Sequence, residues 1–123
     1  MVYRKNISEE QAKTAIEHGE FTDDIVNSRA HVAIIMTQDW CPEWRMMQIW
    51  LKSLVKRKRP DDIDIDVYEL EYDKLDSSDD FMRFKETTFG NSLIPYVRYY
   101  KDGKLIDESN YVKRDAFLSK LTG

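Results

Sequence analysis

The sequence has little of several residue types, and each scarcity excludes a class of protein. Its 123 residues include one cysteine, four glycines and three prolines. One cysteine excludes an internal disulfide and a cysteine-rich zinc site. The low glycine and proline content excludes collagen-like and low-complexity chains. We therefore expect one ordered domain spanning residues 1–123, with no metal site and no cofactor.

Positive charge and long apolar runs are also scarce. Nineteen lysines and arginines stand against 23 acidic residues, a net charge of −4, whereas a general nucleic-acid binder is basic. No run approaches the roughly 20 apolar residues of a membrane-spanning helix, and the first residues lack the apolar core of a signal peptide. We therefore expect a cytoplasmic, monomeric protein that binds neither nucleic acid nor a membrane.

Hydrophobic periodicity in the first half predicts helices that alternate with strands. Ser8 and Gln11 have the spacing of a capping box that begins a helix, and Gly19 is suited to end it. The apolar, β-branched run 31–37 is typical of a strand buried on both faces. Cys41-Pro42 then opens a longer helix, because proline suits the first helical turn.

The second half adds a strand at 63–70, a helix from about 78 to 90, a hairpin between 96 and 107, and a closing helix at 112–121. Asp102-Gly103 in the hairpin is a strong signal for a two-residue turn. Together, the elements predict an α/β fold with a central mixed β-sheet flanked by helices.

Two charged segments stand out. The run Lys56–Arg59, followed by Pro60, is interpreted as a solvated helix end rather than a nucleic-acid patch, since cations suit the negative end of the helix dipole. The stretch 61–80 holds ten acidic residues and one base, Lys74. It is interpreted as a solvated acidic face that repels nucleic acid.

Two motifs follow one another in an informative order. Trp40-Cys41-Pro42-Glu43-Trp44 lies at a strand-to-helix junction, and Phe89-Gly-Asn-Ser-Leu-Ile-Pro95 precedes the hairpin Lys101-Asp-Gly-Lys104. From about Ile7 to the C-terminus the sequence resembles the thioredoxin family. The resemblance implies a thioredoxin fold in which a loop with Pro95 in the cis form faces Cys41 and its helix.

Three positions depart from the family pattern. The family's redox motif has two cysteines separated by two residues, but Trp44 stands where the second is expected after Cys41. The acid that the family often carries six residues before the first cysteine is Ile35, and the lysine near it on the next strand is Glu69. Both missing groups are associated with proton transfer to the second thiol. All three departures therefore affect the same step, the reaction of the second thiol, and together they exclude the ordinary dithiol cycle.

Cys41 remains the candidate catalytic nucleophile. A thiol at a helix N-terminus feels the positive end of the dipole, which favours the thiolate, and Arg45 would add to this effect. Asp39 and Glu43 oppose it, because nearby negative charge disfavours a second anion. An inert buried thiol is the alternative interpretation. His31 lies at the far end of the preceding strand, so no Cys–His pair is expected.

Several neighbours of Cys41 are expected to bind substrate: Trp40, Pro42, Trp44, Ile94 and Pro95. Trp44 is expected to be exposed near the helix start, as aromatic binding residues often are. Trp50 falls on the apolar stripe of the same helix and is expected in the core. Pro95 is expected both to set the backbone geometry and to contact substrate.

Three functions fit these residues. In the first, Cys41 performs thiol–disulfide exchange in cell redox homeostasis as a monothiol oxidoreductase. It forms a mixed disulfide with a protein or small-molecule thiol or disulfide, and an external thiol resolves it. In the second, the same scaffold is a redox-inactive module that holds an extended peptide or protein partner. The third is a glutaredoxin-like role with glutathione or a shared cluster, which Cys41-Pro42 favours but Trp40 and Leu93-Ile94 do not.

Overall fold

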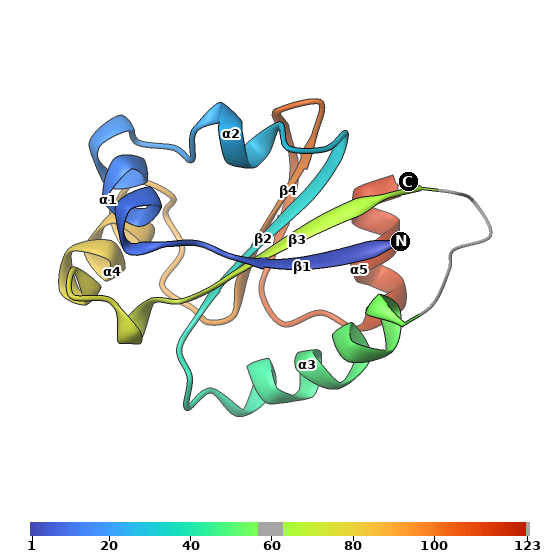
Figure 1. Ribbon diagram of the computed structural model, residues 1–123. Coiled ribbons are helices and arrows are strands. Elements are labelled where there is room, and N and C mark those ends of the chain that lie inside the picture. The colour runs from blue at the N-terminus through green and yellow to red at the C-terminus, as the bar shows by residue number, and fades with distance from the viewer. Residues whose placement is uncertain (57–62, 123) are drawn as a thin grey trace.

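A five-stranded mixed sheet forms the centre of the molecule (Figure 1). The computed structural model describes residues 1–56 and 63–122. The strand order is β1-β3-β2-β4-β5, in which β1, β3 and β2 are parallel and β4 and β5 are antiparallel. The strands are β1 (Val2–Asn6), β2 (His31–Thr37), β3 (Ile65–Glu71), β4 (Tyr96–Lys101) and β5 (Lys104–Ser109). The expected α/β class with a mixed sheet is confirmed.

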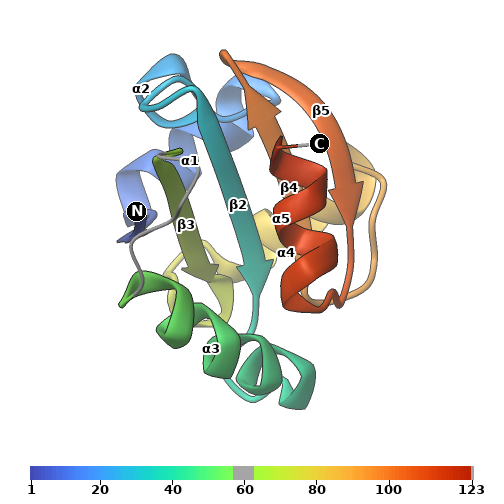
Figure 2. The same ribbon diagram turned by 90° about the vertical axis from the view of Figure 1, so that its right-hand side faces the viewer.

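Helices cover both faces of the sheet (Figures 1 and 2). One face carries α1 (Glu9–His18), α2 (Asp23–Val26) and α4 (Ser78–Thr87), and the other carries α3 (Pro42–Val55) and α5 (Arg114–Thr122). A 3-10 turn, η1 (Tyr72–Lys74), follows β3. Residues of β2 alternate between the two cores, with Ile34 on the α1 side and Ile35 on the α3 side. This is why the whole strand is apolar, as predicted.

The local signals at Ser8, Gly19 and the hairpin act as predicted. The Ser8 hydroxyl accepts a hydrogen bond from the Gln11 amide at 3.1 Å, and the Gln11 side chain accepts one from the Ser8 amide at 2.9 Å. Gly19 ends α1 with a φ of 79°, and Asp102 and Gly103 turn the hairpin with φ values of 51° and 80°. Positive φ at both central residues is the geometry that two-residue hairpin turns require.

The edge strand β1 was not predicted, because charge rather than hydrophobic alternation identifies it. Only Val2 in this strand is buried. Arg4 donates a hydrogen bond from Nη2 to Oε1 of Glu69 at 2.6 Å, and Lys5 donates one to Asp66 at 3.0 Å. Ladder hydrogen bonds and two ion pairs therefore attach β1 to β3, and the charged side chains suit a sheet edge.

The charged segments differ in part from their interpretation. Residues 57–62, which include most of the basic run and Pro60, lie outside the described part of the chain. In the acidic stretch, the Asp66 side chain is buried rather than solvated, and it accepts hydrogen bonds from Ser28, Lys5 and Arg29. Burial alone would raise the pKa of Asp66, but these hydrogen bonds outweigh it and hold the pKa below its usual value.

No described helix is both long and apolar enough to span a membrane.

Candidate functional site

Cys41 lies at the junction between β2 and α3. It is the N-cap residue of α3, and Pro42 occupies the first helical turn, as the sequence predicted. The residue is only 4% exposed. Its Sγ lies 4.0 Å from the carbonyl oxygen of Ile94, close enough for a weak S–H···O contact. The chain's one thiol therefore faces a loop that is 53 residues away in sequence.

That loop is held rigidly by polar side chains. The Ile94–Pro95 peptide bond is cis. The side-chain amides of Asn91 and Asn110 exchange two hydrogen bonds of 3.2 and 3.0 Å, and Asn110 also donates to the Pro95 carbonyl at 3.0 Å. Lys85 donates to the Asn91 carbonyl at 2.8 Å. No local sequence signal identified Asn110 or Lys85, because their partners lie across the fold.

Trp40 provides an exposed aromatic surface beside Cys41. Its ring is 59% exposed, and its Nε1 donates to Oε1 of Gln38 at 2.6 Å. Gln38 in turn donates from Nε2 to the Tyr72 hydroxyl at 3.1 Å. Burial raises the pKa of Tyr72. Leu93, whose side chain is 62% exposed, adds a second apolar contact point from the loop before Pro95. Exposed apolar side chains of this kind are suited to bind those of a partner.

The expectation that Trp44 is exposed is wrong. Trp44 is fully buried, and its Nε1 donates to Oε2 of Glu71 at 2.9 Å. It shares the inward face of α3 with Met47 and Leu51, since residues three and seven apart lie on one side of a helix. Trp50 is only partly buried, with its ring 4.9 Å from that of Phe117. Trp44 is therefore a core residue that cannot contact a substrate here.

Glu71 completes the environment of Trp44. Besides the indole, it binds Lys74, whose Nζ lies 3.0 Å from Oε1. Burial would raise the pKa of Glu71, but the hydrogen bonds from Trp44 and Lys74 outweigh it, so that the pKa lies below its usual value. The position of the family's second cysteine thus holds an indole bound to an ionised carboxylate.

The other two departures leave the inner side of Cys41 apolar. Ile35 is fully buried and packs in the same core cluster as Cys41. Glu69 pairs in register with Ile35 across the sheet, as the resemblance implied, but its carboxylate is bound by Arg4. Because position 35 holds an isoleucine, it offers no acid that could receive or supply a proton.

The charged residues expected to influence Cys41 have different surroundings. Asp39, one of the two opposing acids, lies 3.7 Å from Nζ of Lys74, and its backbone amide donates to Asp73 at 3.0 Å. Glu43 and Arg45 are both exposed on the first turn of α3. Asp39 therefore lies close to a cation, whereas Glu43 and Arg45 face solvent.

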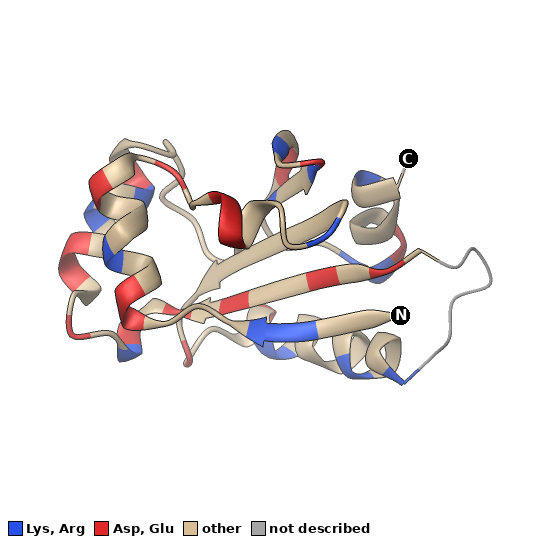
Figure 3. Ribbon diagram, turned by 45° about the horizontal axis from the view of Figure 1, so that its top comes forward, with Lys and Arg blue, Asp and Glu red and all other residues tan. Residues whose placement is uncertain are grey.

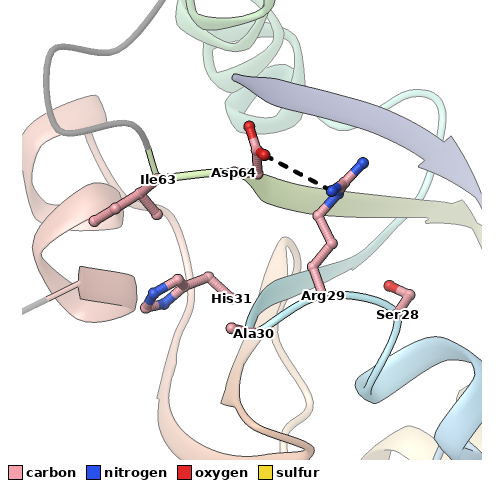
Figure 4. Close-up of a pocket in the computed structure, with 6 residues that line it drawn as sticks. All are labelled: Ser28, Arg29, Ala30, His31, Ile63 and Asp64. Carbon is pink, nitrogen blue, oxygen red and sulfur yellow. Dashed lines mark ion pairs between the residues drawn. The ribbon is translucent and has the colours of Figure 1, made fainter.

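His31 takes no part in this site. It begins β2, and its Nδ1 lies 3.0 Å from the Leu121 carbonyl oxygen. Figure 4 shows the open pocket of about 390 Å³ that it lines with Arg29 and Asp64, which form an ion pair at 3.9 Å. β2 runs six residue steps from His31 to Thr37, about 20 Å at roughly 3.3 Å each, so His31 and Cys41 lie at opposite ends of the strand. Within the described residues, no group of three or more histidines, cysteines or acids is arranged to hold a metal ion.

Comparisons with known proteins establish the fold. No family model and no curated protein matches the sequence. A mutant thioredoxin from Halobacterium salinarum NRC-1 is similar in structure, with a TM-score of 0.65 and 17% identity over 97% of this chain and 88% of that one. The short form of spinach chloroplast thioredoxin f gives 0.65 and 14% over 97% and 90%. A mutated buckwheat glutaredoxin gives 0.54 and 19% over 93% and 89%.

These likenesses define the class of protein to which the architecture belongs. The chain has the thioredoxin fold, and the match extends over nearly all of its length. The fold that the two sequence motifs implied is thereby confirmed.

Proposed function

We propose that the protein performs thiol–disulfide exchange through Cys41 alone. The observation that carries the proposal is the placement of the one thiol at the N-terminus of α3, facing the carbonyl of Ile94 beside the cis Pro95. A helix N-terminus favours a thiolate over a thiol. The similarity to thioredoxin structures supports the same chemistry.

The proposed reaction has two balanced steps. The Cys41 thiolate attacks one sulfur of a disulfide, forms a new S–S bond to it, and expels the other sulfur as a thiolate that takes a proton from water. A second thiolate, from a small-molecule thiol or a partner protein, then attacks the mixed disulfide and releases Cys41. Because Trp44 replaces the second cysteine and is buried, the resolving thiol has to come from outside the chain.

The partner is proposed to bind in extended form across the loop 91–95. Extended peptides bind such sites through backbone hydrogen bonds, while pockets select side chains. Trp40, next to Cys41 in sequence, and Leu93, in the loop before Pro95, offer exposed apolar surface. The hydrogen bonds of Asn91 and Asn110 fix the loop beforehand, which reduces the entropy lost on binding.

A catalysed exchange assay tests this proposal. A peptide mixed disulfide is incubated with glutathione, and release of the peptide thiol is followed with wild type, Cys41→Ser and Trp40→Ala. We expect Cys41→Ser to abolish the acceleration and Trp40→Ala to reduce it severalfold without changing stability, because Trp40 is exposed. Acceleration that persists in Cys41→Ser would refute the proposal.

The near-complete burial of Cys41 favours a second candidate, a redox-inactive binding module. A thiol only 4% exposed, in contact with a carbonyl, reacts slowly unless the loop 91–95 moves. In that case the same surface holds a peptide without covalent chemistry. Peptide binding that is equal in wild type and Cys41→Ser, with no catalysed exchange by either, distinguishes this function from the first.

A further inference from the structure

A second surface, separate from Cys41, lies between α3 and the start of α5. An open groove of about 630 Å³ is lined by, among others, Met46, Ile49, Trp50, Tyr111, Lys113 and Arg114. Met46 and Ile49 are 56% and 69% exposed. Residues three and four apart share one side of a helix, so the three α3 residues form a continuous apolar stripe. We refer to this surface as the α3–α5 groove.

Two residues of the apolar stripe, Met46 and Ile49, are exposed and are not explained by the folding of the chain, whereas Trp50 also packs against the core. Met47 and Leu51 already provide the inward face of α3, and they are fully buried. The ring of Trp50 is fixed against Phe117, with 4.9 Å between centroids, so one wall of the groove is rigid. Tyr111 on the opposite wall is 37% exposed. A contiguous exposed apolar surface with a polar rim is typical of a protein-binding site.

The rim of the groove carries positive charge in an acidic protein. Arg45 and Lys52 lie four residues before and three after Ile49, on the same side of α3. Lys113 stands on the other wall. These three cations form no ion pair within residues 1–56 and 63–122, whereas Arg114 is paired with Asp115 at 3.1 Å.

Most of the acidic residues lie elsewhere on the molecule. Figure 3 shows many of them on α1 and α4, at the end of the molecule away from the groove. Of the acids near the groove, Asp115 lines it and is paired with Arg114 at 3.1 Å, and Glu43 lies in the first turn of α3. The net charge of −4 therefore conceals a local excess of positive charge along α3. A surface of this sign attracts an acidic partner and repels a basic one.

We propose that the α3–α5 groove binds an acidic amphipathic helical segment of another protein. Apolar side chains of the segment, spaced three or four residues apart, occupy the groove against Met46, Ile49 and Trp50. Its carboxylates pair with Arg45, Lys52 and Lys113 on the two rims. Cys41 does not line the groove. Binding there is consequently independent of the exchange reaction proposed above.

Two matched synthetic helical peptides test the proposal. Both carry leucine at positions i, i+3, i+4 and i+7, and they differ only in glutamate or lysine at the flanking positions. Binding of each fluorescein-labelled peptide to Cys41→Ser protein is measured by fluorescence anisotropy, so that no disulfide contributes. We expect the glutamate peptide to bind at least about tenfold more tightly, and added salt to weaken it.

Two variants locate the binding site. Ile49→Ser removes the most exposed large apolar side chain of the groove, and it is expected to weaken the glutamate peptide about tenfold, as for loss of one buried apolar contact. Ile106→Ser is the matched control, because Ile106 is 46% exposed on β5 and does not line the groove. It is expected to leave the affinity unchanged.

Several results would overturn the proposal. Equal affinity for the two peptides, no binding of either, or unchanged affinity in Ile49→Ser would each do so. Self-association in sedimentation velocity that Ile49→Ser abolishes would assign the groove to a second copy of the chain. Ile49-dependent binding to phosphatidylglycerol vesicles, with no preference for the glutamate peptide, would assign it to a membrane surface.

Discussion

Replacing Trp44 with phenylalanine is expected to destabilise the protein by about 2.5 kcal/mol. The substitution removes the indole N–H that donates to Glu71 at 2.9 Å. Hydrogen bonds to charged groups contribute about 1.5 to 3 kcal/mol, and the lower value applies because Glu71 keeps its contact with Lys74 at 3.0 Å. The smaller ring leaves a cavity of roughly 40 Å³, which adds about 1 kcal/mol.

Urea unfolding followed by circular dichroism measures this loss. Trp40→Phe is the matched control, because that ring is 59% exposed, and it is expected to change the free energy of unfolding by less than about 0.5 kcal/mol. Combining Trp44→Phe with Glu71→Gln in a double-mutant cycle measures the contribution of the charge to this contact, since the glutamine oxygen can still accept from the indole, and the expected coupling is about 1 kcal/mol. If Trp44→Phe were as stable as Trp40→Phe, Trp44 would not be the buried residue described above.

Three further substitutions test the interior and the hairpin by urea unfolding. Asp66→Asn is expected to cost about 2 kcal/mol at pH 7, because the buried carboxylate accepts three hydrogen bonds. Since its folded-state pKa is lowered, this contribution is present above about pH 4 and is lost as the pH falls through the folded-state value. Burial lowers the pKa of Lys85 to about 8, so the unfolded chain binds a proton that the folded state has released between pH 8 and 10.5. Wild type should therefore gain up to about 3 kcal/mol relative to Lys85→Met across that range. Gly103→Ala should cost about 1 to 2 kcal/mol, because φ is +80° and the added Cβ would lie 3.3 Å from Cγ of Asn27.

Each of these predictions has a result that contradicts it. For Asp66→Asn, an equal loss at pH 7 and pH 3 would show that the ionised carboxylate is not what stabilises the fold. For Lys85, a difference from Lys85→Met that stays constant up to pH 10.5 would mean that the amine is not desolvated. Gly103→Ala with the stability of wild type would show that the turn accepts a side chain.

Local signals predicted most elements of the fold. The capping box at Ser8, the left-handed Gly19, the proline after Cys41 and the Asp102-Gly103 turn each act within a few residues, and the structure bears them out. The apolar run of β2 also predicted a buried strand correctly, because both faces of that strand are covered by helices. Such signals depend on short-range backbone preferences that the sequence displays directly.

Features that depend on distant partners could not be predicted. β1 is attached by ion pairs to residues more than 60 positions away, so its own pattern gives no hydrophobic period. Trp44 and Trp50 lie on neighbouring sides of one helix, and only the packing of α3 on the sheet decides that Trp44 is the buried one. The clamp of Asn91 and Asn110 on the loop before Pro95 likewise exists only in the folded chain.

The rate at which Cys41 forms a mixed disulfide tests the central proposal most directly. Wild type is mixed with glutathione disulfide at pH 7, folded and in urea, and the adduct is quantified by mass spectrometry with Cys41→Ser as the blank. If the N-terminus of α3 activates the thiol, the folded protein reacts faster than the unfolded chain. A folded protein that is protected, and that reacts only in urea, would contradict thiol–disulfide exchange and assign the site to non-covalent binding.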